Sequence, residues 1–270
     1  MSAFVPLLRR GVVRVSGPDA AGFLDGLLTC DLDGAPDAAP TRGALLTPQG
    51  KLLAELWLHR REGVDGWLID LPRGEVADFV KRLTLFKLRA NVEIEDRSDD
   101  LVVEAGVDSP ARRIVDAADA AAPTEDDLAA YDAARIARGE AEQGVDYGPN
   151  EVFPSDVNLD LLGGVAYAKG CFVGQEVVSR MKRRGTIRKR TLVMSTEDGP
   201  PASGAPITAD GSALGQALSS AGGKTLALVR LDRLAAADPG AIRVEDRPAR
   251  IDFPDWFPED AKNSGASEGA

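Results

Sequence analysis

Apolar positions in the first hundred residues follow two spacings, alternation in some runs and a helical repeat in others. Alternation indicates a half-buried strand, and recurrence every three to four residues indicates an amphipathic helix. In chain order the patterns predict a strand at 11–16, a helix after Asp19, a hairpin of strands at 44–47 and 51–58 around Pro48-Gln49-Gly50, a strand at 66–71, a helix at 74–88, and strands at 91–95 and 101–107. Hairpins dominate over repeated strand–helix–strand units, so the predicted fold class is α+β.

The pattern changes in the second half of the chain. Residues 108–126 are rich in Ala, Asp and Pro and predict a surface excursion or a short helix, and a helix follows at 128–138. From residue 187 onward, short strand-like runs alternate with Gly, Pro and Asp turns at the spacing of a small β-barrel. We therefore predict an α/β domain at 1–185, a barrel domain at 186–258 and a disordered tail at 259–270.

Charge and cysteine content exclude several classes of protein. The 270 residues carry a formal net charge of −11, which argues against a nucleic-acid coat or an anionic membrane surface as the main partner. No apolar run approaches the roughly 20 residues of a membrane span. Cys30 and Cys171 are too few for a disulfide framework, and the first ten residues resemble neither a secretory nor an organelle leader. These features predict a cytoplasmic protein with reduced thiols and no membrane partner.

Candidate metal ligands are sparse. The single histidine, His59, and the two separated cysteines form no cluster with metal-ligand spacing, so no stably bound metal is expected. His59 has no Ser or Cys partner in a motif and is interpreted as an exposed strand residue. Cys30 is interpreted as a small buried hydrophobe.

One basic segment stands out in this acidic chain. Residues 169–190 contain eight basic residues and one acid, and they include a predicted helix from Gln175 to Arg184 that is followed by Gly185. The segment could hold an anion such as a polyglutamate tail, a phosphate or an RNA backbone. It could equally be a solvated helix end that complements its own dipole. Aromatic residues do not alternate with the basic ones, so RNA is not expected as a partner.

Cys171 lies just before the predicted helix. Partial positive charge at a helix N-terminus and the cation of Lys169 would both favour its thiolate, which indicates a reactive thiol. The alternative is a small buried side chain in a tight turn. The residues alone leave both interpretations open.

The octapeptide Lys169-Gly170-Cys171-Phe172-Val173-Gly174-Gln175-Glu176 resembles the K-G-C-[YF]-x-G-Q-E signature of YgfZ-type folate-binding proteins of iron–sulfur cluster assembly. These are relatives of the glycine-cleavage aminomethyltransferase. Flanking stretches agree with the same family in the same order: Gly17-Pro18-Asp19, Leu28-Thr29-Cys30-Asp31, Thr47-Pro48-Gln49-Gly50-Lys51, Phe153-Pro154, Asn158-Leu159, Gly163-Gly164-Val165 and Ile187-Arg188-Lys189-Arg190. An eight-residue match with ordered flanks is a specific signal.

This resemblance implies an aminomethyltransferase-like folate-binding α/β domain followed by a small C-terminal β-barrel. It also implies a role in the assembly or repair of [4Fe–4S] proteins, with tetrahydrofolate or a derivative as cofactor and with client proteins and cluster carrier proteins as partners. Cys171 and Lys169 would carry the chemistry. The folate would contact residues of the signature and its surroundings: Asn158, Lys169, Gln175, Glu176 and Arg180.

One departure from the family pattern bears on the function. Aminomethyltransferases carry an acid in an R-L-E-A-G segment, and this chain has Arg135-Ile136-Ala137-Arg138-Gly139 instead. The leading hypothesis is therefore a maturation factor without a classical turnover reaction of its own. The alternatives are a folate-dependent aminomethyl- or methyltransferase and, second, an RNA-binding module linked to tRNA modification.

Overall fold

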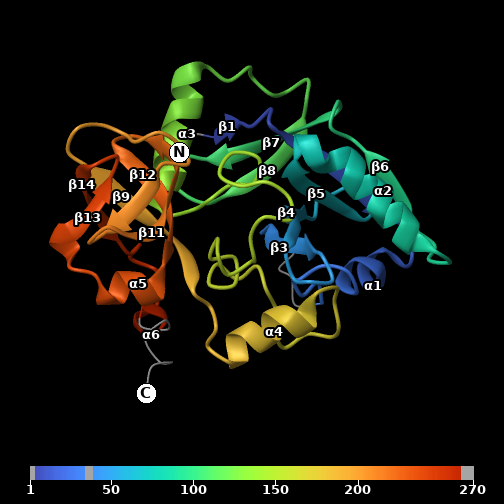
Figure 1. The fold of residues 1–270 in the computed structure, drawn as a ribbon. Helices are drawn as coiled ribbons and strands as arrows, with labels where there is room; N and C mark the ends of the chain where they lie inside the picture. Colours follow the sequence, from blue (N-terminus) through green and yellow to red (C-terminus); the bar gives the residue numbers. More distant parts are fainter. Residues whose placement is uncertain (1–3, 34–38, 263–270) are drawn as a thin grey trace.

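A computed structural model describes residues 4–33 and 39–262, which form an N-terminal part built on two sheets and a C-terminal barrel (Figure 1). The larger sheet has the order β3-β4-β5-β2-β6, with bounds β2 Arg10–Ser16, β3 Thr41–Leu46, β4 Leu52–His59, β5 Trp67–Pro72 and β6 Glu93–Asp96. The smaller sheet has the order β1-β7-β8, with bounds β1 Phe4–Pro6, β7 Leu101–Gly106 and β8 Arg112–Asp116. Neighbouring strands in both sheets pair antiparallel, which confirms the predicted α+β class.

Two helices border the larger sheet. α1 (Ala20–Asp25) follows β2, and α2 (Val76–Lys87) follows a short 3-10 turn at Arg73–Glu75. α2 buries Phe79 and Leu83 in the main core, where they join Val13 and Val15 of β2. Burial of the apolar stripe of α2 on the sheet fixes the helix in place.

The barrel closes in the order β10-β11-β12-β9-β14-β13, and closure leaves no strand edge unpaired. The bounds are β9 Lys189–Thr196, β10 Pro206–Ala209, β11 Ser212–Ala221, β12 Lys224–Arg230, β13 Ile242–Val244 and β14 Arg247–Asp252, with α5 Leu231–Ala236, a 3-10 turn at Pro239–Ala241 and α6 Glu259–Lys262. The strand interiors bury a separate core that includes Leu192, Met194 and Ile207. The predicted C-terminal barrel is therefore confirmed.

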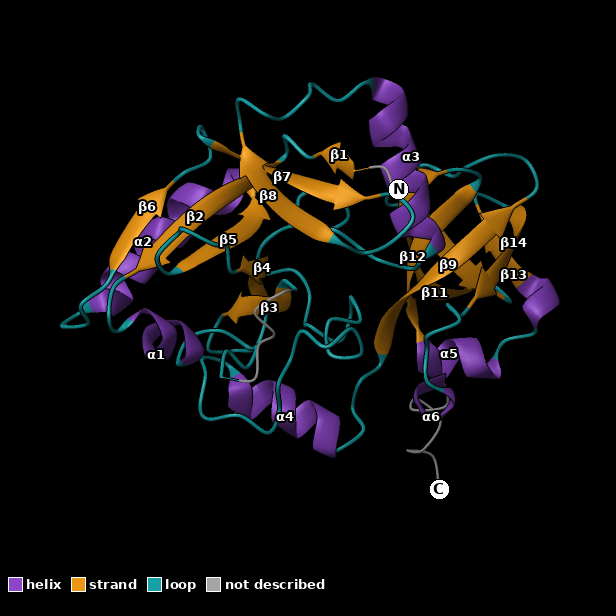
Figure 2. Ribbon diagram, turned by 180° about the vertical axis from the view of Figure 1, so that it is seen from behind, coloured by secondary structure: helices purple, strands orange, loops and turns teal. Residues whose placement is uncertain are grey.

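α3 (Glu125–Ala137) connects the two parts and is seen beside β1 and β12 in Figure 2. A capping box fixes its start, because Thr124 and Asp127 each satisfy the other's backbone N–H. Tyr131 packs in the cluster of β1, and Ile136 packs in a cluster that includes barrel residues. The segment between α3 and α4 (Gln175–Arg183) consists mainly of turns and carries much of the candidate site.

The structure differs from the expected elements at several places. The stretch expected to be a surface excursion or short helix contains β8, and β1, β14 and α5 were not predicted. His59 was expected to be exposed but is buried at the end of β4, where it pairs with Leu68 of β5. The predicted tail begins with α6, and its residues 263–270 lie outside the described part of the chain.

Within residues 4–33 and 39–262, no helix combines the length and apolar character that a membrane crossing needs. The same residues contain no group of three or more His, Cys, Asp or Glu side chains placed to hold a metal ion.

Candidate functional site

The signature octapeptide forms a loop that leads into α4, and this loop packs against the β3–β4 hairpin. Gly174 precedes α4 with a φ of 82°, and a Cβ there would lie 2.6 Å from the carbonyl oxygen of Thr47. Only glycine combines this left-handed backbone with so close an approach. The second glycine, at position 50 of the hairpin turn, faces Val177 and Val178 of α4 in the same way. The two glycines therefore fix the helix start on the hairpin.

Lys169 anchors the loop to the end of α1. Its side chain is 2% exposed, and its Nζ donates to the Asp25 carboxylate (2.8 Å) and to the backbone carbonyls of Asp25, Leu28 and Cys30 (2.6, 3.1 and 2.7 Å). These four acceptors occupy the ammonium fully, since it has three protons. Lys169 thus faces the segment at 25–30.

The two cysteines occupy opposite environments. Cys171 is exposed, whereas Cys30 is buried against Gly43, and burial raises the pKa of the Cys30 thiol to about 12. Cys30 is therefore a protonated core side chain, in agreement with its interpretation as a small buried hydrophobe. Cys171 is the thiol that a partner can reach.

A hollow of about 690 Å³ runs along α4 beside the Cys171 loop. Its lining combines an aromatic ring with amide, carboxylate, hydroxyl and cationic groups: Tyr167, Gln175, Glu176, Ser179, Lys182 and Arg183. Lys182 stacks its ammonium 3.9 Å from the centre of the Tyr167 ring. The amide of Gln175 donates to the carbonyl of Gly170 (3.3 Å), so the hollow adjoins the residue before Cys171. Such a lining suits a flat, polar-edged ring that carries an anionic group.

Asn158 lies on the barrel side of the same segment. It is fully buried with a φ of 60°, and its amide donates to the Thr191 carbonyl of β9 (2.7 Å), whereas its Oδ1 has no hydrogen-bond partner. Nearby, Arg190 forms a buried ion pair with Asp160 (2.5 Å). Burial, followed by the charge of Asp160, raises the pKa of Tyr167, which remains a hydroxyl donor at neutral pH. Asn158 keeps a free acceptor in this polar environment.

The structure thus brings part of the predicted site together. Gln175 and Glu176 line the hollow, and the Gln175 side chain is hydrogen-bonded to Gly170, the residue before Cys171. Arg180 is exposed on α4 and does not line the hollow. Lys169 and Asn158 do not line it either: Lys169 is bonded to the end of α1, and Asn158 is bonded to β9 of the barrel. Of the eight basic residues at 169–190, Lys169 and Arg190 are buried and paired, so the basic surface consists of the others.

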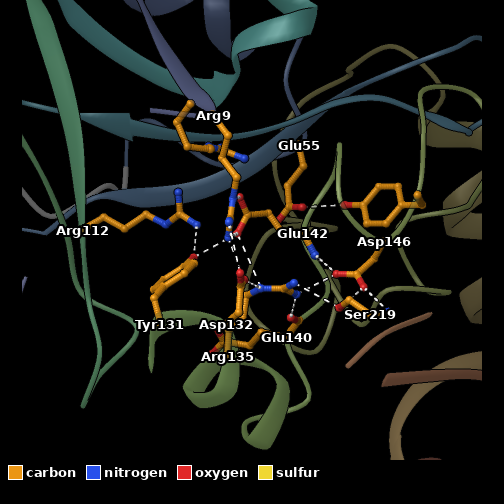
Figure 3. Close-up of polar contacts among 12 residues, drawn as sticks. Arg9, Glu55, Arg112, Tyr131, Asp132, Arg135, Glu140, Glu142, Asp146 and Ser219 are labelled. Atoms are coloured by element: carbon orange, nitrogen blue, oxygen red, sulfur yellow. Dashed lines mark hydrogen bonds and ion pairs between the residues drawn. The ribbon is translucent and has the colours of Figure 1, made fainter. Parts of the chain in front are cut away.

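A buried charge network that the sequence did not reveal lies between the smaller sheet, α3 and the barrel (Figure 3). Arg135, 1% exposed, donates to Asp132 (2.6 Å), Asp146 (2.7 Å) and the Ser219 hydroxyl of β11 (3.1 Å). Glu142 accepts from Arg9 (2.9 Å) and from the Tyr131 hydroxyl (3.1 Å). Burial opposes ionisation of Glu142, but the surrounding arginines outweigh it and hold its pKa well below the usual range.

The only sequence signal for this network was the arginine of the 135–139 segment. That segment was interpreted through its missing acid at Ala137, which the structure places at the surface. The carboxylates that Arg135 contacts come instead from positions 132 and 146. Spacing along α3 could have indicated the first pair, but the contact with Ser219 spans 84 residues.

Both the N-terminal part and the barrel are similar to known proteins. The sequence profile described as CAF17, C-terminal beta-barrel domain, matches residues 188–259. The solved structure of the glycine cleavage system aminomethyltransferase T from Bartonella henselae superposes with a TM-score of 0.72 over 94% of this chain and 86% of that one, at 16% identity. The fold and its barrel thus define the class: an aminomethyltransferase-like fold with a CAF17-type barrel.

The curated relatives narrow this class. The human iron-sulfur cluster assembly factor IBA57, mitochondrial, is 30% identical over 94% of this chain and 85% of its own length, and the mouse protein is 29% identical over the same shares. The chain belongs to the IBA57 family of iron–sulfur cluster assembly factors. A homologue from Mycosarcoma maydis is 32% identical over 69% of this chain, which spans only 55% of that longer protein.

These relatives also correct one prediction. The predicted cytoplasmic location is contradicted by the human, mouse and Mycosarcoma maydis relatives, all named as mitochondrial proteins. Composition and cysteine count indicate a reducing environment. Because several cell compartments are reducing, these two features could not distinguish the cytoplasm from the mitochondrion. The resemblance to iron–sulfur assembly proteins with an aminomethyltransferase fold is confirmed at that level.

Proposed function

We propose that this protein is an accessory factor in the assembly or repair of [4Fe–4S] proteins that presents Cys171 beside a folate-binding hollow. The observation that carries the proposal is the exposed thiol on a loop clamped at both sides, by Lys169 on α1 and by Gly174 on the β3–β4 hairpin. A loop held at both sides presents its thiol in one fixed geometry, which favours binding of the same type of ligand each time.

The cluster is cargo in this proposal. A [4Fe–4S] cluster generally takes four thiolates, and Cys171 is the exposed one of only two cysteines in the chain. Cys171 can therefore supply one ligand, and the remaining ligands must come from a client or a carrier protein. This requirement makes contact between the protein and a cluster-bearing partner part of the function.

The hollow along α4 fits tetrahydrofolate. The Gln175 amide and the Glu176 carboxylate offer hydrogen bonds for the edge of a pterin ring, and the Tyr167 ring offers an apolar face. Lys182 and Arg183 offer cations for the glutamate carboxylates. When bound, tetrahydrofolate would supply a reduced ring that can carry a one-carbon unit. The protein's residues bind and orient it, and Tyr167 donates a hydrogen bond at its hydroxyl.

The test of the assembly role is complementation of cells that lack the protein, with the activity of [4Fe–4S] enzymes as readout. Cys171→Ser is expected to restore little activity, because serine keeps the loop but removes the soft ligand. Cys30→Ala, the matched control in the buried cysteine, is expected to restore it. Full activity with Cys171→Ser would remove Cys171 from the proposal.

A further inference from the structure

The C-terminal end of α2 lies at one tip of the molecule (Figure 1). The end of this helix and the turn after it expose apolar side chains. Leu85, Phe86 and Leu88 are 68%, 45% and 88% exposed. Phe79 and Leu83 of α2 are buried in the main core, and Phe86, one turn after Leu83, continues their stripe toward the end of the helix, where it is exposed with Leu85 and Leu88. Uncovered apolar groups of this size mark interaction sites in soluble proteins.

Positive charge surrounds this tip. In a chain of net charge −11, residues 79–92 contain no acid and four basic residues: Lys81, Arg82, Lys87 and Arg89. None of the four has an ion pair with another described residue. Helical spacing puts Lys81 and Arg82 one turn before Leu85 and Phe86, on the same face. Cations and apolar side chains are therefore interleaved on one surface.

The tip is concave. A hollow of about 450 Å³ lies between the start of α1 and the turn after α2, and Phe23, Phe86 and Leu88 are among its walls. Its one carboxylate, Asp19, accepts from the Asn91 backbone N–H (2.7 Å). Leu88 has a φ of 45° and a ψ of −102°, a strained backbone for leucine, and keeps its side chain in solvent.

We propose that this tip docks an acidic segment of a partner protein, with an apolar side chain in the hollow and carboxylates on Lys81, Lys87 and Arg89. Charge complementarity selects the acidic segment, and the hollow selects a side chain over a flat bilayer surface.

The location connects docking with the Cys171 loop. α1 lies between the tip and α4 in both Figure 1 and Figure 2. Its first turns contribute Gly22 and Phe23 to the hollow, and its last residue, Asp25, binds Lys169. Six helical residues span about 9 Å. A partner at the tip therefore contacts the helix that also anchors the Cys171 loop, an arrangement that does not depend on folate binding.

The test measures binding of a fluorescein-labelled peptide of repeated Glu-Leu-Asp-Phe units to the full chain by fluorescence anisotropy. Leu85→Gln with Leu88→Gln, and separately Lys81→Glu with Arg89→Glu, are each expected to weaken binding at least tenfold. Leu8→Gln, which changes another exposed leucine, and Lys224→Glu, at the exposed start of β12, are expected to leave binding unchanged. All these side chains are exposed, so an unchanged unfolding midpoint confirms that each variant is folded.

Three outcomes would overturn the proposal. One is no binding by the parent protein, or binding by the tip variants that is as tight as that of the parent protein. Another is loss of binding on Arg183→Glu with Arg184→Glu, which would place the acidic segment on α4. The last is that the tip variants abolish adsorption to cardiolipin vesicles or self-association while peptide binding persists, which would assign the tip to a membrane or to a second copy.

Discussion

At the scale of single residues, Lys169 shows how a signature residue can be structural. An ammonium that donates to one carboxylate and three carbonyls closes the end of α1 and holds the loop before Cys171. Removing the charge leaves those carbonyls without a donor in a buried place, and unpaired buried groups cost more than a hydrogen bond adds.

Lys169→Met is therefore expected to lower the free energy of unfolding by about 2–4 kcal/mol. Lys182→Met, in the same segment but exposed over Tyr167, is the control and is expected to change it by less than about 1 kcal/mol. Urea unfolding measures both. Equal, small effects would mean that the anchor contributes nothing and that Lys169 is free for chemistry.

His59 gives a pH prediction at the same scale. Burial, and then the charges of Arg112 and Arg10, lower its pKa to about 4 from an ordinary 6.5. The unfolded chain therefore takes up a proton between pH 6.5 and 4 that the folded chain refuses, so stability falls as the pH falls through this window. The loss reaches roughly 3 kcal/mol. His59→Gln, which removes the only histidine, is expected to flatten this part of the stability profile. An unchanged profile would show that His59 titrates normally.

At the scale of elements, the contact of α4 with the β3–β4 hairpin depends on one glycine. Gly174→Ala forces a Cβ against the Thr47 carbonyl, whereas Gly185→Ala, also at a positive φ of 63°, meets no atom within 4 Å. The second variant is expected to cost about 1 kcal/mol of unfolding free energy from backbone strain alone, and the first at least twice that. Thermal unfolding would show the difference, and equal melting points would mean that the close approach relaxes freely.

The elements found from the sequence are those with a strong local signal. Turn residues indicate the hairpin around Pro48-Gln49-Gly50, and the helical spacing of apolar residues indicates α2 and α4. β8 is short and lies in an Ala- and Asp-rich stretch, and it forms because β7 pairs with it. β1 is three residues long and has the same dependence. Tertiary pairing, which no local window contains, decides such strands.

At the scale of the whole molecule, the buried charge network joins the N-terminal part to the barrel. Arg135 reaches from α3 to Ser219 of β11 through a group of carboxylates in which each charge has a partner. Removal of one member leaves the others uncompensated.

Arg135→Met is expected to destabilise the protein by about 3–5 kcal/mol and to make the barrel and the N-terminal part unfold in separate steps. Arg250→Met, in an exposed pair with Asp252, is the control, with less than about 1 kcal/mol expected. Differential scanning calorimetry would detect the second transition. A single transition with an unchanged midpoint would show that the network does not couple the two parts.

The residues of the candidate site also differ in how far their contacts extend along the sequence. The signature residues Cys171, Gln175 and Glu176 are contiguous, so the sequence could indicate them together. The anchor of Lys169 spans 144 residues, and the network of Arg135 joins β11 to α3. Contacts over such distances arise only when the chain folds, so the sequence did not reveal which signature residue faces the hollow and which supports it.

We propose that the hollow along α4 and the Cys171 loop form one folate-binding site. The most direct measurement is thermal unfolding during titration with tetrahydrofolate and its polyglutamates. Ligand at one hundred times its dissociation constant is expected to stabilise the protein by about 2.7 kcal/mol. Glu176→Ala should remove this shift, and Glu197→Ala, an exposed glutamate of the barrel, should retain it. No shift in the parent protein, or an equal shift in both variants, would contradict the claim.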